Sequence, residues 1–389
     1  MFFDASIFLW LLLPVAAVSG WFAAKLDQRR RDKHDLPTAY FKGLNFLLNE
    51  QPDKAIEVFV QVLEVNSDTV ETHLAVGNLF RRRGEVDRAI RVHQNLIARP
   101  MLDKNQRAQA LLELGQDYLK AGLFDRAENL FSELVEMRLH QEPALRFLMQ
   151  IYQQEREWQK AIATGRKLAR VSGKNLNDTI AQFNCELADG ARLAGDIASA
   201  REYAKSALSA DSGCVRASLL LGDIDAAQGR HQEAIKAWQR IEQQDPQFID
   251  EAAPRLAASF RALGADAAFR ELFERFLERH GGAAVMLALA EIVQQREGAA
   301  AAEQFIAKWL RKRPSVQGLH RLIELNLARS EDGARSDLET LKTIIEQLRQ
   351  RQSLYGCQQC GLKSHALYWQ CPGCNRWNSI KPLGDKLAA

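Results

Sequence analysis

The chain shows no marked excess of charge of either sign and none of the common catalytic motifs. Its 52 basic and 49 acidic side chains leave a net charge of +3 over 389 residues, which is too balanced for a protein that binds nucleic acid along its length. It contains no phosphate-binding loop, no His-Glu-x-x-His motif and no Gly-x-Ser-x-Gly motif, and its eight histidines are scattered without ligand spacing. These absences predict that the protein is not an enzyme.

Cysteine is scarce and unevenly distributed. Of the six cysteines, Cys185 and Cys214 are isolated, whereas the other four fall close together near the C-terminus. A secreted protein of this size would usually spread its cysteines as disulfides, so the clustering favours a reducing compartment and a metal site. Cys185 and Cys214 are interpreted as small buried apolar residues on helices of different repeats, with no partner thiol evident beside either.

The N-terminus carries the one long run without charge. No residue from Ala5 to Ala24 is charged, and twenty helical residues span about 30 Å, the thickness of a bilayer's hydrocarbon core. We therefore expect a transmembrane anchor over residues 1–24 and a basic juxtamembrane linker over 25–35. The flanking cations all follow the run, which predicts that the rest of the chain faces the cytoplasm. A cleaved signal peptide would need a basic segment before the run, and none is present.

The middle of the chain, residues 36–352, repeats with a period of 34. A small residue recurs in each unit, at Ala55, Ala89, Ala127, Ala161, Ala200, Ala234, Ala268 and Ala302. Five of the seven spacings are 34 residues, and the other two are 38 and 39. Glycines precede four of these alanines by twelve residues, at 43, 77, 115 and 222, and aromatic residues follow three of them by four, at 59, 131 and 238. This pattern resembles the tetratricopeptide family, whose repeat is a pair of antiparallel helices.

The expected fold is therefore all-α, a tetratricopeptide-like solenoid of about eight or nine helical hairpins. Turn glycines such as Gly84, Gly122 and Gly229 would supply the positive φ of a helix end. The two long spacings predict longer loops between repeats, one of them around Gly173. The segment after Ser330 is predicted to form a last hairpin or a capping helix.

Stacked first helices of such hairpins would form a concave face suited to an extended peptide or a partner helix. Which residues bind a partner is unknown from the sequence. The run Arg81–Arg83 could bind an anion, but we interpret it as a solvated helix end whose cations favour the helix dipole.

The most specific motif lies in a C-terminal domain predicted over residues 353–389. Two Cys-x-x-Cys knuckles, Cys357/Cys360 and Cys371/Cys374, are separated by ten residues. Each knuckle can place two thiolates on one ion, so the four cysteines predict a closed tetrahedral site for zinc or iron, without an open position for catalysis.

Two further residues support these knuckles. Gly361 permits a positive φ after the first knuckle, and Asn375 tolerates the same conformation after the second. Few apolar residues surround them, so metal binding should supply most of the domain's folding free energy. We expect some of the domain's aromatic side chains to pack onto the last repeat.

The knuckle pair resembles that of rubredoxins, with two departures. Asn375 stands where rubredoxins usually have glycine, and the ten-residue gap is shorter than in free rubredoxins or common zinc ribbons. The residues by themselves leave iron and zinc open as the bound metal.

The order of parts resembles the lipopolysaccharide assembly protein B family of Gram-negative inner membranes, over essentially the whole chain. The resemblance implies a single-pass inner-membrane adaptor with its bulk in the cytoplasm. Such an adaptor regulates lipopolysaccharide biosynthesis by promoting degradation of the lipid A deacetylase by a membrane AAA-type protease, and gathers other lipopolysaccharide synthesis or transport proteins. The resemblance also favours iron as the single ion bound by Cys357, Cys360, Cys371 and Cys374.

Two other functions are considered. A rubredoxin-like iron could transfer electrons, although residues 353–389 carry only a weak basic excess for docking a redox partner. A zinc-ribbon module could bind nucleic acid through Trp369 or Trp377, but a membrane tether and the balanced charge argue against this partner. Whether the protein forms a homodimer is left open.

Overall fold

The computed structural model describes residues 70–100, 102–330 and 332–385, with a few single positions between 19 and 58. The predicted anchor, the basic linker and the hairpin around Ala55 lie almost entirely outside these described residues. Among the residues that are described, no helix combines the length and the apolar character needed to cross a membrane.

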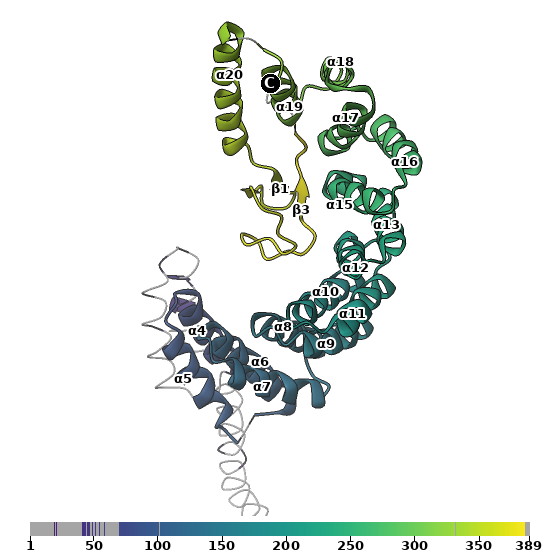
Figure 1. Cartoon of the computed structure of the whole chain (residues 1–389). Coiled ribbons are helices and arrows are strands. Elements are labelled where there is room, and N and C mark those ends of the chain that lie inside the picture. Colours follow the sequence, from purple (N-terminus) through teal and green to yellow (C-terminus); the bar gives the residue numbers. More distant parts are fainter. Residues whose placement is uncertain are drawn as a thin grey trace, which may run out of the picture. The chain divides into compact units, whose positions relative to one another are not determined.

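The chain divides into two compact units, Met1–Ile151 and Tyr152–Ala389, whose described residues are mainly helical (Figure 1). In the first unit, hairpins pair α4 (Val70–Arg82) with α5 (Val86–Ile97), and α6 (Lys104–Lys120) with α7 (Phe124–Glu136). Helix α8 (Gln141–Gln154) contains the division. The tetratricopeptide-like helical fold predicted from the period of 34 is confirmed.

The second unit begins with α9 (Trp158–Ser172) and continues with five hairpins. Their helices are α10 (Asn177–Leu193) with α11 (Ile197–Ala210), α12 (Val215–Ala227) with α13 (His231–Gln239), α15 (Ile249–Ala262) with α16 (Asp266–Arg279), α17 (Ala283–Glu297) with α18 (Ala299–Leu310), and α19 (Val316–Leu327) with α20 (Asp332–Arg351). Two short elements, α14 (Ile241–Gln244) and η1 (Pro246–Phe248), precede α15. The segment after Ser330 forms the single helix α20, which packs on α19, so it corresponds to the predicted capping helix and not to a further hairpin.

The unit ends in three short strands, so the fold is not purely helical. They are β1 (Tyr355–Cys357), β2 (Lys363–Ser364) and β3 (Ile380–Pro382). The all-α prediction missed them because each has only two or three residues, too few to show an alternating pattern.

Close packing within hairpins explains the recurring glycines. A Cβ atom on Gly115 would lie 2.5 Å from the Phe131 ring, and one on Gly222 would lie 2.2 Å from Nε1 of Trp238. Both aromatic side chains are buried, and each belongs to the second helix of the same hairpin. The glycine and the aromatic residue therefore form a matched pair in which the ring occupies the space that a side chain would take.

In the α4/α5 hairpin a histidine takes the place of the aromatic residue. A Cβ on Gly77 would lie 2.2 Å from Nε2 of His93, which is fully buried. His93 Nδ1 lies 2.5 Å from Asp117 on α6, and Arg81 donates to Asp117 at 2.8 Å and to Glu113 at 2.6 Å. The prediction of a solvated helix end is wrong for Arg81, because its guanidinium reaches two carboxylates on the next hairpin and only 17% of the side chain is exposed.

The repeat alanines are buried with one exception among the described residues. Those that are fully buried are Ala89, Ala127, Ala161, Ala200, Ala234 and Ala302. Ala268 is exposed, and Phe269 beside it is buried. The predicted position is wrong in this repeat because α16 turns large aromatic residues, Phe269 and Phe273, toward the core.

Turn glycines behave as predicted, but one of the two long loops does not. Gly84, Gly122 and Gly229 have φ values of 83°, 75° and 73°. The linker before α6 is long, whereas the linker before α10 (173–176) has the same length as those at 137–140 and 211–214. The extra residues of that repeat extend the helix instead, since α10 has 17 residues and α12 has 13.

Helix α17 receives its N-terminal cap from a neighbouring helix. The residue before it, Gly282, has no side chain, and Asp250 on α15 accepts a hydrogen bond from Ala283 N at 3.1 Å. A Cβ on Gly282 would lie 2.2 Å from Asp250 Oδ1, so glycine is required for this carboxylate to approach. Burial raises the pKa of Asp250 to about 6, against the opposing effect of hydrogen bonds from the start of α17.

Candidate metal centre

A three-stranded antiparallel sheet supports the C-terminal domain. The strand order is β2-β1-β3, and β1 pairs with both neighbours. Cys357 ends β1 opposite Ile380 of β3, and both side chains are buried. The first knuckle therefore starts from the centre of the sheet.

The two knuckles have the same backbone geometry. In the first, Gly361 N donates to Cys357 O at 3.0 Å, and in the second Asn375 N donates to Cys371 O at 2.8 Å. Gly361 has a φ of 76° and Asn375 has a φ of 56°, as predicted from their residue types. This repeated turn points the thiols of both knuckles toward one point.

The sulfur atoms have the spacing of a tetrahedral metal site. Cys357 Sγ lies 3.8 Å from Cys374 Sγ, Cys360 Sγ lies 3.7 Å from Cys371 Sγ, and all four lie within 4.8 Å of one another. Four thiolates at about 2.3 Å from a tetrahedral ion are about 3.8 Å apart. The donor set therefore fits one zinc or iron ion, and the sulfurs are equally compatible with both.

The four cysteines differ in exposure. Cys357 and Cys371 are buried, Cys374 is half-buried and Cys360 is exposed. A hydrogen bond with the Ser379 hydroxyl, 3.4 Å from Cys357 Sγ, is the largest cause that lowers the pKa of Cys357 to about 6. A low pKa favours the thiolate at neutral pH, which is the form that binds a metal.

The C-terminal domain is docked against the first helices of several hairpins in the second unit. Trp377 donates from Nε1 to Gln153 at 3.2 Å, and its ring lies edge-on to Trp158 and Phe183, with centroids 6.3 and 6.0 Å away. Asn378 beside it accepts a hydrogen bond from Gln182 on α10 at 2.7 Å. One side of the domain is thus held to the region of α8–α10.

Aromatic and charged contacts hold the other side of the domain near α15. Trp369 stacks on Phe248 with centroids 5.6 Å apart, and Lys381 forms an ion pair with Asp245 at 2.7 Å. Tyr355 donates its hydroxyl hydrogen to Glu251 on α15. Burial, with the contribution of this carboxylate, raises the pKa of Tyr355.

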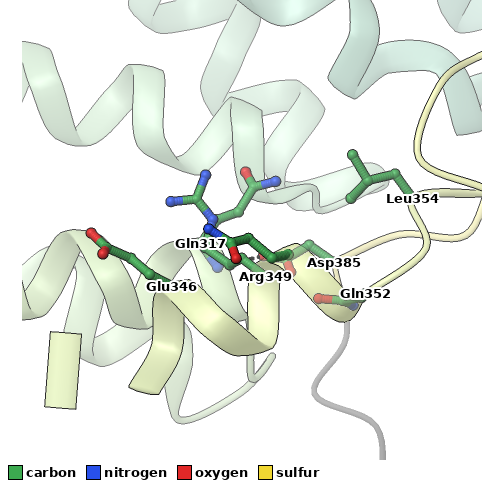
Figure 2. A pocket seen from close by; sticks show the side chains of 7 residues that line it. Gln317, Glu346, Arg349, Gln352, Leu354 and Asp385 are labelled. Carbon is green, nitrogen blue, oxygen red and sulfur yellow. Dashed lines mark hydrogen bonds between the residues drawn. The ribbon is translucent and has the colours of Figure 1, made fainter. Parts of the chain in front are cut away.

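The chain end extends these contacts to α19. Asp385 accepts hydrogen bonds from Ser315 Oγ at 2.5 Å and from Gln317 N at 2.8 Å. A pocket of about 340 Å³ lies beside them, and Figure 2 shows its lining residues: Gln317, Glu346, Arg349, Gln350, Gln352, Leu354 and Asp385. Because Asp385 already caps the start of α19, we interpret this pocket as part of the docking junction.

The docking differs from the expectation that the aromatic side chains would pack onto the last repeat. Trp369, Trp377 and Tyr355 instead contact residues between 153 and 251, far earlier in the chain. Gln153, Phe183 and Glu251 among these partners lie on the first helices α8, α10 and α15, which present the face that a tetratricopeptide solenoid offers to ligands, whereas Trp158 begins α9 and Phe248 lies in η1. The C-terminal domain therefore occupies this face itself in the second unit.

A second feature escaped the sequence analysis. Cys185 and Cys214 are buried, as expected, but they are not isolated, because their sulfur atoms lie 3.8 Å apart. The two residues are 29 positions apart on different hairpins, and only the stacking of repeats brings them together.

Comparison with known proteins agrees with both parts of the fold. A family model described as rubredoxin metal binding domain matches residues 355–382, and tetratricopeptide repeat models match residues 72–108, 112–174 and 185–247. Lipopolysaccharide assembly protein B of Escherichia coli strain K12 is 38% identical over 379 residues, covering 96% of this chain and 97% of that protein. The protein of the same name from Haemophilus influenzae strain Rd is 35% identical over 395 residues, covering 97% and 98%.

Proposed function

Because the chain belongs to the lipopolysaccharide assembly protein B family, we propose that it is a non-enzymatic adaptor of lipopolysaccharide assembly, held at the inner membrane by its N-terminal run. The observation that carries the proposal is the near-complete alignment with two relatives of that name, at 38% and 35% identity. In the finer form of the proposal, the adaptor faces the cytoplasm and presents the lipid A deacetylase to a membrane AAA-type protease.

Physical features of the chain support an adaptor over an enzyme. Helical-hairpin repeats offer extended surfaces for proteins. The tetrathiolate centre is closed, since four protein sulfurs already complete a tetrahedral shell and leave no position for a substrate. The metal would therefore act by holding the C-terminal domain together, and the domain in turn would hold the first helices of the second unit in one arrangement.

The test follows the half-life of the lipid A deacetylase. In a Gram-negative host whose own family member is depleted, the deacetylase should become long-lived, and expression of this chain should restore rapid turnover. A chain lacking residues 1–24 and a Cys371→Ser chain should both fail to restore it, because one loses the anchor and the other a metal ligand. Cys185→Ala removes a thiol outside the metal centre and serves as the matched control that restores turnover.

Each arm separates one part of the proposal from the rest. If wild type leaves the half-life unchanged, the proteolytic role is wrong. If the anchorless chain works as well as wild type, membrane attachment is not needed for it. If Cys371→Ser works while its purified form binds no metal, the metal centre has no part in the adaptor role.

A further inference from the structure

Outside the metal centre, a pair of thiols lies in contact between two hairpins. Cys185 is on α10, and Cys214 is the residue that precedes the first turn of α12. Helices α10 and α12 contact each other directly, the two sulfur atoms are 3.8 Å apart, and the side chains are 0% and 2% exposed. A disulfide needs a sulfur–sulfur distance of about 2.05 Å, so the two atoms have less than about 2 Å to close.

The surroundings make Cys214 the better nucleophile of the two. Its position at the start of α12 places the sulfur beside the positive end of the helix dipole. The hydrogen bond with the Cys185 thiol is the largest cause that lowers the pKa of Cys214, and the Ala217 backbone N–H also lowers it. Burial raises the pKa of Cys185. Cys214 therefore loses its proton more readily than Cys185, and the two sulfurs are in contact, as an attacking and a resolving cysteine must be.

We propose that Cys185 and Cys214 form a disulfide when the protein meets a hydroperoxide. The Cys214 thiolate attacks one peroxide oxygen, so a sulfur–oxygen bond forms, the oxygen–oxygen bond breaks and hydroxide leaves. The sulfur of Cys185 then attacks the resulting sulfenic acid, the sulfur–sulfur bond forms, and the hydroxyl leaves as water with the Cys185 proton. In total, two thiols and one hydrogen peroxide give one disulfide and two waters.

A single side chain, that of Gln182, separates the Cys185–Cys214 pair from the docked C-terminal domain. Gln182 is fully buried, and its Nε2 donates both to Cys214 Sγ at 3.4 Å and to Asn378 of that domain at 2.7 Å. Arg216 on α12 packs over Trp369 of the same domain, with its guanidinium carbon 6.0 Å from the ring centroid. The oxidant should therefore reach the thiols faster when the domain is undocked.

The experiment uses the metal-loaded full chain in detergent. The protein is treated with one to ten equivalents of hydrogen peroxide, alkylated under denaturing conditions and digested with trypsin, which separates residues 175–192 from residues 206–216 and from the peptides of the metal centre. We expect these two peptides to appear as one cross-linked species, and dithiothreitol to separate them. In Cys185→Ser the cross-link should be absent, and Cys214 should be trapped as sulfenic acid by dimedone.

The rate of cross-linking gives a second readout. In Trp377→Ala, which keeps all four metal ligands but weakens docking, the cross-link should form at least a few times faster. The proposal is overturned if both thiols are still alkylated at a dose that has oxidised the metal-centre cysteines. It is also overturned if Cys185 and Cys214 pair with metal-centre peptides instead of with each other.

Discussion

Gly222 has no room for even one added methyl group. Its Cβ would lie 2.2 Å from the indole nitrogen of Trp238, a side chain that is itself buried. We therefore expect Gly222→Ala to lower the free energy of unfolding by about 1–3 kcal/mol through overpacking. Gly190 is the matched control, because it lies in α10 with open space around its Cβ. Gly190→Ala should raise the free energy of unfolding by about 0.5–1 kcal/mol. Denaturant titration of both variants would contradict this account if they shifted in the same direction.

Asp250 should make the free energy of unfolding of the second unit depend on pH. Its pKa is about 6 in the folded protein, above the ordinary value of 3.8, so the folded state holds its proton more strongly than the unfolded state. The resulting stabilisation is complete below pH 3.8 and is lost as the pH rises through 6. Between pH 5 and pH 8, wild type should lose about 1 kcal/mol of stability relative to Asp250→Asn. Parallel curves for the two proteins across this range would show that Asp250 ionises normally.

Single residues were predictable wherever a local rule decides their conformation. Gly361 and Asn375 were assigned positive φ from the knuckle pattern alone, and both have it. His93 was missed because the repeat rule expects an aromatic ring at its position, and its Asp117 partner lies 24 residues away. The Cys185–Cys214 contact was missed for the same reason, since it depends on how one hairpin stacks on the next.

Among the elements, the segment around Trp377 makes the contacts that dock the C-terminal domain near α10. The ring lies against Trp158 and Phe183 while its nitrogen donates to Gln153. Removing a fully buried tryptophan costs about 3–5 kcal/mol, and Trp377 is only half-buried. We expect Trp377→Ala to weaken docking by about 2 kcal/mol while the protein keeps its metal.

Limited proteolysis and metal analysis would check this prediction together. The variant should be cut faster in the connection between α20 and β1, with a metal content equal to that of wild type. Tyr368 provides the control, because Tyr368→Ala removes an aromatic ring of the same domain that is 46% exposed. Equal protection of wild type and Trp377→Ala would show that the polar contacts alone hold the domain.

The period of 34 predicted the positions of the helices along the chain, but it did not predict their lengths. The period predicts where each hairpin falls, because the alanine and glycine positions must meet inside it. The extra residues of a longer repeat can lengthen a loop or a helix without disturbing that contact. In the repeat of α10 they lengthen the helix, which has 17 residues. The strands of the C-terminal domain follow from knuckle geometry and pairing rather than from a pattern of their own.

For the whole second unit, the metal should act on helices that it does not contact. Without the ion the C-terminal domain should unfold, because its own core is small. The helices under it would then lose Trp369, Trp377 and Tyr355 as packing partners. We expect chelation to lower the melting temperature by about 5–10 °C, since each kcal/mol is worth about 2–4 °C in a unit of this size.

Hydrogen exchange would locate this effect. Amides of residues 355–382 and of the helices α10 and α15 should exchange faster after chelation. Helix α18, the second helix of its hairpin, should change little. Acceleration confined to residues 355–382 would show that the repeats are stable without the docked domain.

Docking at this scale could not be predicted from the sequence. Its hydrogen bonds join residues separated by 224, 196 and 104 positions, and no periodic pattern connects such distant segments. The sequence led to the expectation that some aromatic side chains of the domain pack onto the repeats, although onto the last one. Their partners were not predicted, because glutamine, phenylalanine and glutamate on the first helices also fit an ordinary solvent-facing or ligand-binding surface.

The contacts made by the C-terminal domain also determine when the second unit can be completed during synthesis. Residues 355–382 leave the ribosome after every helix that they cover, so the faces of α10, α12 and α15 stay bare until these residues have been made. A message truncated before Cys371 would yield repeats that fold but are never covered. Exposed apolar surface is what chaperones and proteases recognise, so the docked domain distinguishes a chain in which both knuckles have been made from one that lacks them.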